Sequence, residues 1–434
     1  MRRGGLLALS RSPLLWSVVL ALPVAIFGLH RFGPSDFVGV NLPALDALRA
    51  GHVGAYLDRS TVDMGSYLLR LPLIFLPNLW GGGSLALYRV LALPALIGLV
   101  WFAVDLWWRG RRMGVTAIAA SCGLVLCILN PFVVSSLIRT HPEDLVGGLL
   151  GIAAVYSARA GRANVTGLVL GLAIANKAWA VVAVVPVLWL LASHRVRAFL
   201  IAGAVPALVL MPLVVRALTK AGGAAAGGSS AGLSQVTSIA NSSYVLKPWE
   251  GWWFFGDSHH LMRSHFGDTH PLYRTPATWI THLSHPLAVL VPAVLCLWLA
   301  SRLDRRRWTT ALLLLAFALQ LRCLLDAWNI DYYEVPFTIA LLAWEILDRR
   351  RVPVMSFLVI ISGWIVMTIL PFSVSPNTQA IAYLLWSVPT ILWMLALLLR
   401  APRRPEVSNG EEKWYAGEPA TSRPAPREVV AAHV

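Results

Sequence analysis

The chain has 434 residues, of which 57% are hydrophobic and 13% are charged, and its mean hydropathy is +0.66. Soluble proteins carry about 25% charged residues, so this composition excludes an ordinary soluble domain. The formal net charge of +15 does not indicate nucleic-acid binding, because the arginines lie in short loops between apolar runs rather than in a soluble basic domain.

Apolar runs that approach the length of a membrane span recur along the chain, which predicts an all-α, polytopic transmembrane bundle of about twelve helices. The expected spans lie near residues 14–29, 84–108, 115–138, 144–158, 165–176, 178–192, 198–218, 283–301, 308–325, 336–347, 352–372 and 378–399. Two segments allow a second interpretation. Residues 66–80 form either a short span or an interfacial helix, and residues 165–192 form either one long helix or a hairpin broken at Asn176–Lys177.

Arginine clusters set the expected orientation. They occur at residues 2–11, 109–112, 159–162, 194–197, 302–307, 348–351 and 400–404. The positive-inside rule places these loops and both termini in the cytoplasm of a plasma-membrane protein. We therefore expect a transmembrane domain over residues 1–400, with a first outer loop at 30–83, a long outer loop at 219–282 and a flexible linker at 221–232. Residues 401–434 are expected to be a disordered cytoplasmic tail.

Most of the unusual polar residues fall on the opposite, outer side in this topology. They occur in the first outer loop, in RTHPED at 139–144, at Asn176–Lys177, in the long outer loop and in LRCLLDAWNIDYYEVP at 321–336. Charged groups at helix ends on one side of a membrane commonly line a water-filled cavity. The alternative is that each loop is simply solvated. Because five loops share the pattern, we expect an outer-face polar cavity.

The residues of several segments resemble those of the GT-C superfamily of membrane glycosyltransferases. Asp36 lies in the loop after the first helix, GLVLGLAIANKAW at 167–179 is similar to the superfamily's G-x₃-G-L-A-x-x-[TN]-K pattern, and HPED and DAWNIDYY are similar to an actinobacterial mannosyltransferase-like branch. The resemblance covers residues 10–400. It implies inverting transfer of a sugar, with mannose as the first candidate, from a polyprenyl-phosphate donor to a lipid or glycan acceptor, without a cofactor or a nucleotide-sugar domain.

Two roles follow from the chemistry of such a transfer. A carboxylate must accept the acceptor's proton, and Asp36 is the expected base; the alternative role for Asp36 is a helix N-cap. The leaving phosphate needs cations, for which the candidates are Lys177, Arg139 and Arg322. Alternatively, Lys177 extends to the interface, and the two arginines form structural ion pairs with Glu143 or Asp326.

The remaining candidates are expected to bind substrate. Pro142, Glu143 and Asp144 also suit a helix start, and the tryptophans at 249–255 also suit an aromatic belt at the membrane surface. The His-rich stretch with His259, His260, His265, Asp268 and His270 lacks strict ligand spacing, so we expect no metal. The expected substrate-binding residues are His141, Glu143, Asp144, Asn176, Trp249, Trp252, His259, Asp326, Trp328, Asn329, Tyr332 and Tyr333.

Two other functions compete with glycosyl transfer. A lipid or solute transporter is the first, although transporters commonly show internal repeats and this chain shows none. A GT-C-like scaffold without catalytic activity is the second, because the first outer loop offers the single acid Asp36 where related enzymes often carry a pair.

Overall fold

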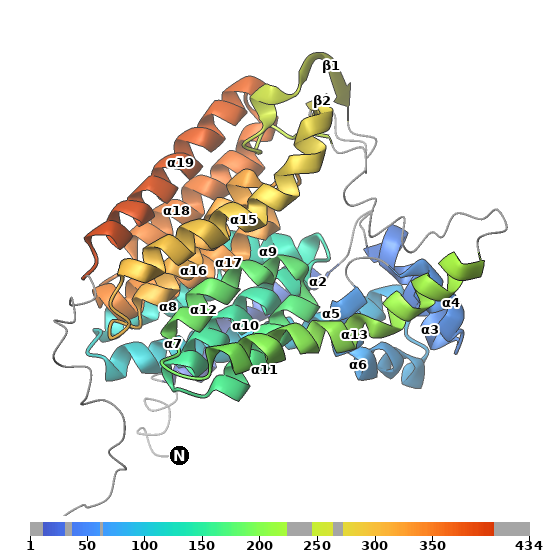
Figure 1. Ribbon diagram of the computed structural model, residues 1–434, viewed down its shortest axis with the longest axis horizontal. Helices are drawn as coiled ribbons and strands as arrows, with labels where there is room; N and C mark the ends of the chain where they lie inside the picture. Colours follow the sequence, from blue (N-terminus) through green and yellow to red (C-terminus); the bar gives the residue numbers. More distant parts are fainter. Residues whose placement is uncertain (1–11, 31–36, 61–63, 224–244, 264–271, 403–434) are drawn as a thin grey trace, which may run out of the picture.

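The computed structural model describes residues 12–30, 37–60, 64–223, 245–263 and 272–402, and almost all of this part is helical (Figure 1). The longer helices are α2 (Pro13–Leu29), α7 (Ser84–Arg112), α8 (Ala117–Ile128), α10 (Pro142–Arg159), α11 (Ala163–Asn176), α13 (Arg195–Gly223), α15 (Thr278–Arg302), α16 (Thr310–Leu325), α17 (Val335–Trp344), α18 (Val354–Trp364) and α19 (Pro376–Arg400). The shorter ones are α3 (Leu42–Arg49), α4 (Val53–Arg59), α5 (Met64–Leu69), α6 (Leu71–Phe75), α9 (Pro131–Ile138) and α12 (Val184–Leu190).

Short 3₁₀ and π turns connect or extend these helices. They are η1 (Phe37–Asn41), η2 (Leu76–Trp80), η3 (Ala178–Ala183), η5 (Trp253–Phe255), η6 (Asp331–Glu334), η7 (Glu345–Arg349), η8 (Ile365–Ile369) and η9 (Leu370–Phe372). Strands β1 (Asp257–Arg263) and β2 (Leu272–Thr275) pair antiparallel, with Met262 opposite Tyr273. This hairpin belongs to the expected long outer loop. Most of the linker at 221–232 and of the tail at 401–434 lies outside the described residues.

Six helices in the described part of the chain are long and apolar enough to cross a membrane, so the chain is an all-α membrane protein. They are Ser84–Arg112, Ala117–Ile138, Arg195–Arg216, Thr278–Arg302, Val354–Phe372 and Pro376–Arg400. The expectation of about twelve crossings is not met by these six. The other expected spans also form helices, but α2, α11 and α16 have only 14 to 17 residues and α10 carries three charged side chains. Hydropathy alone does not show where a helix ends.

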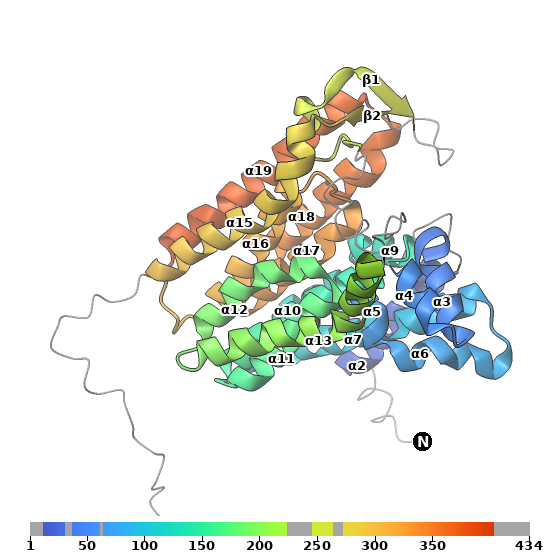
Figure 2. The same cartoon turned by 45° about the vertical axis from the view of Figure 1, so that its right-hand side comes forward.

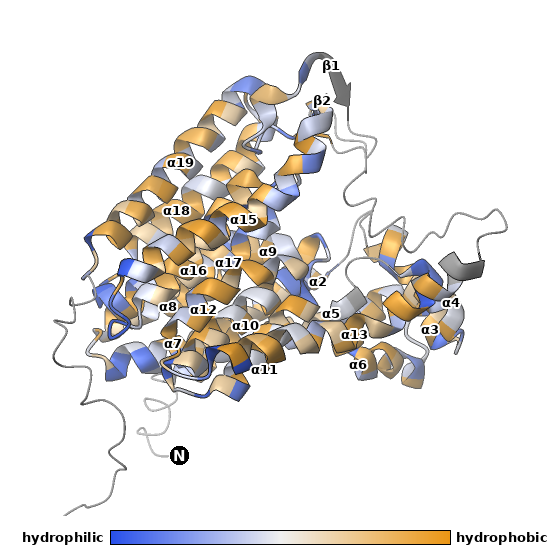
Figure 3. Cartoon of the chain, viewed as in Figure 1, coloured by the Kyte–Doolittle hydropathy of each residue, from blue (hydrophilic) through white to orange (hydrophobic). Residues whose placement is uncertain are grey.

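The centre of the bundle consists of α16 and α17. All ten residues of α17 are buried, and α16 is buried from Thr310 to Cys323. A helix that is apolar on every side must lie inside a bundle or in lipid, and here α15, α19, α10 and α18 pack around this pair. Figures 1 and 2 show α15, α16, α18 and α19 lying side by side. Hydrophilic residues gather at helix ends and turns, whereas the helix bodies are hydrophobic (Figure 3).

Both ambiguous segments are broken in the structure. Residues 66–80 form α5, α6 and η2, with Pro72 and Pro77 in the first turns of the last two, so this segment is not one continuous helix. Between α11 and η3, Lys177 adopts an extended backbone with φ −155° and ψ 119°. The break ends α11 beside the polar turn that precedes α10.

Two glycines allow α11 to pack closely against α13. A Cβ atom on Gly167 would lie 2.6 Å from the backbone oxygen of Ala198, and one on Gly171 would lie 2.7 Å from Cβ of Val205. The spacing of four residues is the small-xxx-small pattern that brings membrane helices together. The GLVLG sequence therefore has a packing role that is independent of any family resemblance.

This contact gives a stability test. Gly171→Leu should destabilise the protein by about 1–3 kcal/mol, because the larger side chain overpacks the contact between α11 and α13. The matched control is Gly203→Leu in α13, where an added Cβ meets nothing within 4 Å. The melting temperature in detergent should fall for the first variant and stay near wild type for the second. Equal falls for both would contradict the packing role.

Candidate functional site

The turn between α9 and α10 buries two carboxylates. Thr140 has φ +67°, a left-handed conformation that folds the chain sharply, and the backbone N–H of His141 donates to the Ser136 oxygen at 2.7 Å. α10 then begins at Pro142, as expected for a first-turn proline, and its first turn contains Glu143 and Asp144. Both carboxylates are almost fully buried, with 1% and 0% exposure. Buried charges require compensation, so the turn needs a cation.

Lys177 supplies that cation from the break after α11. Its ammonium lies 3.2 Å from Oε1 of Glu143 and 3.7 Å from Oδ2 of Asp144, and its side chain is 11% exposed. The His141 Nδ1 atom lies 2.6 Å from Glu143 Oε1, and the Trp179 indole donates to Asp144 Oδ1 at 2.8 Å. One ammonium thus lies between two carboxylates. Each carboxylate has a further partner of its own, His141 for Glu143 and Trp179 for Asp144.

Asn176 fixes the relative positions of four helices. Its Nδ2 donates to the backbone oxygen of Glu143 at 2.7 Å, and its Oδ1 accepts from Ser66 of α5 at 2.8 Å. Arg70 donates to Ser66 and to the backbone oxygen of Leu91 in α7. The expected substrate-binding residue Asn176 therefore joins α10, α11, α5 and α7 in this structure, and its two polar groups are both engaged.

A second charged group approaches from the end of α16. Arg322 pairs with Asp326 at 2.8 Å, and the guanidinium lies 4.4 Å from the centre of the Tyr333 ring. The His285 imidazole of α15 lies 3.2 Å from the other carboxylate oxygen of Asp326. Tyr332 stacks on His141 with ring centres 4.4 Å apart, which joins this segment to the turn before α10.

Both arginines form ion pairs, but only one has a partner that the sequence suggested. Arg322 pairs with Asp326, whereas Arg139 lies 3.0 Å from Asp331 rather than at Glu143. Ser135 donates to the same carboxylate at 2.6 Å. The Arg139 side chain is 51% exposed and that of Arg322 is 8% exposed, so Arg139 is the more accessible cation.

The loop at residues 245–256 lies over the end of α16. The Trp249 indole donates to the Asn329 oxygen at 3.2 Å and the Trp252 indole to the Leu325 oxygen at 2.7 Å. The Lys247 ammonium lies 4.8 Å from the centre of the Trp328 ring and 3.9 Å from Glu250. Burial raises the pKa of Glu250 and lowers that of Lys247. These tryptophans anchor the loop through their N–H groups, a role that the sequence did not suggest.

Asn329 is fully buried, like Asp144. Its Nδ2 donates to Glu334 at 3.2 Å and lies 3.1 Å from the Tyr383 hydroxyl. Burial raises the pKa of Glu334 to about 8. These two hydrogen bonds join the turn between α16 and α17 to Tyr383 of α19.

For two of the expected site residues, the structure describes no side chain. Asp36 lies outside the described residues, and so does the side chain of His259 in β1. The next residue after Asp36 is described: Phe37 is buried and packs on Tyr88, with ring centres 5.4 Å apart. The Tyr88 hydroxyl donates to the backbone oxygen of Leu137, two residues before Arg139. The chain that follows Asp36 is therefore anchored beside the turn before α10.

Several residues of the cluster were missed from sequence. Trp179 and Asp331 lie within two quoted motifs, GLVLGLAIANKAW and DAWNIDYY, but were not assigned a role. His285 lies inside an apolar helix and Lys247 in a long loop, and no spacing rule connects either to Asp326 or Trp328. The missed residues are Ser66, Arg70, Trp179, Lys247, Glu250, His285, Asp331 and Glu334.

His141, Glu143 and Asp144 also offer a possible set of metal ligands. One ligand atom from each lies within 4.8 Å of the others, and imidazole with carboxylates suits several divalent ions. The Lys177 ammonium already neutralises the same carboxylates, so a metal ion would have to displace it. Residues 264–270 of the His-rich stretch lie outside the described residues, and so do the side chains of residues 259–263.

Glu334 gives a prediction about pH. Its carboxyl is protonated in the folded state up to about pH 8, whereas an ordinary carboxyl loses its proton near 4.5. Between these values the folded protein binds the proton more tightly, so the free energy of unfolding should fall as the pH rises and then level off. In Glu334→Gln this part of the fall should be absent. Melting temperatures of both proteins in detergent between about pH 5 and 9 provide the test, and parallel curves would contradict the assignment.

No model of a known protein family matches this chain, and no curated protein sequence matches it either.

Proposed function

We propose that this chain is a GT-C-type membrane glycosyltransferase that transfers a hexose, with mannose as the first candidate, from a polyprenyl phosphate to a lipid or glycan acceptor. One observation carries the proposal. Four segments that are far apart in sequence bring Lys177, Arg322, Arg139 and Lys247 together with buried carboxylates at one end of apolar helices. Structural ion pairs alone do not require so many charges in so apolar a protein.

The cations suit a phosphate leaving group. Arg139 is half-exposed and suits the first contact with the donor, whereas Lys177 lies deeper and is held between Glu143 and Asp144. Lys247, which the sequence did not suggest, adds a fourth positive charge from the opposite loop. As the bond between the sugar and the phosphate breaks, negative charge grows on the phosphate oxygen, and fixed cations lower the energy of that state.

The reaction needs one base. The acceptor hydroxyl oxygen attacks C1 of the sugar from the face opposite the phosphate, the bond from C1 to the phosphate oxygen breaks, and polyprenyl phosphate leaves with the bonding electrons. The acceptor proton passes to a carboxylate, for which Asp36 is proposed. The anchoring of Phe37 through Tyr88 to Leu137 supports this choice, because it ties the neighbouring chain to the turn before α10.

The aromatic and polar residues around these groups suit sugar recognition. His141 and Tyr332 form a stacked pair, and Trp328 presents its ring to Lys247. Oε2 of Glu143 and Oδ2 of Asp144 are buried and accept no hydrogen bond, so each carboxylate keeps an unused acceptor beside these rings. The arginine-rich loops support a cytoplasmic position for both termini and an outer position for the site in the plasma membrane.

A transfer assay tests the proposal. Membranes containing the wild type should move radiolabelled mannose from polyprenyl-phosphate mannose into lipid. Asp36→Asn should lower the rate by about 10²–10⁴-fold, as expected for loss of a general base. Lys177→Ala should lower it by about 10²–10³-fold, as expected for loss of a fixed charge at the leaving group. Asp46→Asn and Arg306→Ala, at exposed positions, are the matched controls.

Each other outcome has a defined meaning. If Asp36→Asn keeps the wild-type rate, the base is among Glu143, Asp144 and Asp326. If the wild type transfers neither mannose nor any of a panel of other polyprenyl-phosphate sugars, the glycosyltransferase proposal fails. A scaffold or a transporter then becomes the better explanation, and a donor-independent flux assay separates those two.

A further inference from the structure

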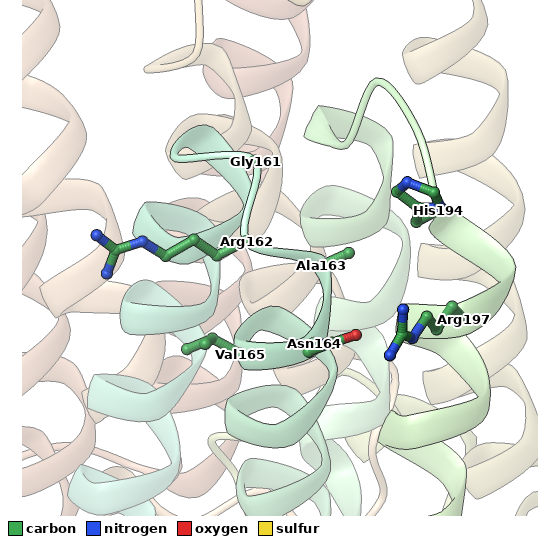
Figure 4. Close-up of a pocket in the computed structure, with 7 residues that line it drawn as sticks. All are labelled: Gly161, Arg162, Ala163, Asn164, Val165, His194 and Arg197. Carbon is green, nitrogen blue, oxygen red and sulfur yellow. The ribbon is translucent and has the colours of Figure 1, made fainter.

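A basic pocket lies at the far end of the same helices. α10 and α11 form a hairpin whose open end carries Glu143 and Asn176, and a pocket of about 320 Å³ surrounds its closed end (Figure 4). Each residue of an α-helix advances about 1.5 Å, so the 14 residues of α11 separate the two sites by about 20 Å. The pocket is therefore distinct from the candidate site for sugar transfer.

The lining of the pocket is basic. Its side chains include Arg162, His194 and Arg197, together with Asn164, and no carboxylate lines it. Figure 4 shows Arg197 and Asn164 turned toward one another with His194 on the same side, whereas Arg162 points away. In the part of the chain that the structure describes, neither arginine pairs with an acidic side chain. The pocket thus holds positive charge without a counter-charge from the protein.

The backbone adds donors to the same space. α11 begins beside the pocket, and no side chain caps its first turn. The N–H groups of an uncapped first turn point outward along the helix and favour an anion. The volume is many times the roughly 30 Å³ of one water molecule, so the pocket has room for a phosphate group.

Apolar side chains next to the pocket indicate where the rest of a ligand would lie. Val165 and Leu168 on α11 are 42% and 47% exposed, and Val196 and Leu200 on α13 are 72% and 62% exposed. Only 11% of the apolar span in α13 is buried inside the protein, the smallest share among the six candidate spans in the described residues. A polar head in the pocket with acyl chains along these helices would match both surfaces.

We propose that this pocket binds a phosphate group, supplied by the headgroup of an anionic phospholipid. Arg197 donates charge-assisted hydrogen bonds to the phosphate oxygens, and the side chains of His194 and Asn164 complete the site with the backbone N–H groups of Asn164 and Val165, since that of Ala163 already donates to Gly161. Free phosphate offers the same oxygens without the acyl chains. The proposal does not depend on sugar transfer, since it uses none of the residues assigned to that reaction.

The test uses the full chain in detergent. The melting temperature is measured with phosphatidylglycerol, phosphatidylcholine or inorganic phosphate, the last against chloride at equal ionic strength. A ligand that binds only the folded state raises this temperature. Phosphatidylglycerol should raise it more than phosphatidylcholine does, and in Arg197→Gln its apparent affinity should fall about tenfold or more. Arg351→Gln removes one exposed arginine elsewhere and should behave as wild type.

A second variant separates binding from folding. Asn164→Asp places an acid in the first turn of α11, where a negative charge favours the helix but repels phosphate. Its melting temperature without lipid should match or exceed wild type, and its response to phosphatidylglycerol should be lost. A response to phosphatidylglycerol alone identifies the headgroup as the ligand, and a response to inorganic phosphate supports a phosphate site open to either source. The proposal is overturned if the wild type responds to neither ligand, or if both pocket variants respond as strongly as the wild type.

Discussion

The cluster of charged residues around Glu143, Asp144, Lys177 and Arg322 depends on how its two buried carboxylates, those of Glu143 and Asp144, are neutralised. Glu143 and Asp144 sit in the first turn of α10 with almost no solvent contact, where an uncompensated charge would cost several kcal/mol. Lys177 supplies the compensating charge. Its ammonium reaches both carboxylates because α11 ends at Asn176, one residue before it. The break in α11, the register of the α10–α11 hairpin and the position of Trp179 all follow from this pairing.

The same constraint explains why the site draws on so many segments. Once the ammonium is shared, each carboxylate still needs a hydrogen-bond donor, and these come from His141 and Trp179. The Trp179 ring in turn faces the Arg322 guanidinium at 5.9 Å, and His141 stacks on Tyr332. Through these rings the first half of the chain is joined to the turn between α16 and α17. Pre-organised charges of this kind are what electrostatic catalysis requires.

The sequence was informative where the chemistry is local. The break at Lys177, the helix start at Pro142 and the pairing of Arg322 with Asp326 four residues later each follow from rules about neighbouring residues. The partner of Arg139 could not be predicted by such rules, because Asp331 lies 192 positions away and only the tertiary fold brings the two together. The predicted number of membrane crossings was not met, for a different reason. Hydropathy reports whether a segment is apolar, but not whether protein or lipid surrounds it, and α16 is enclosed by other helices.

The enclosure of α16 and α17 has a consequence for biogenesis. A short helix with little contact to lipid gains little from entering the bilayer alone, and one that ends in Arg322 and Asp326 would carry their charges with it. The long apolar helices, such as α15 and α19, do not share this difficulty because each satisfies the bilayer by itself. The chain is thus built so that its outer helices can partition into the membrane first. The central helices α16 and α17 are enclosed only once α10, α15, α18 and α19 surround them, so the burial of Arg322 and Asp326 depends on those outer helices.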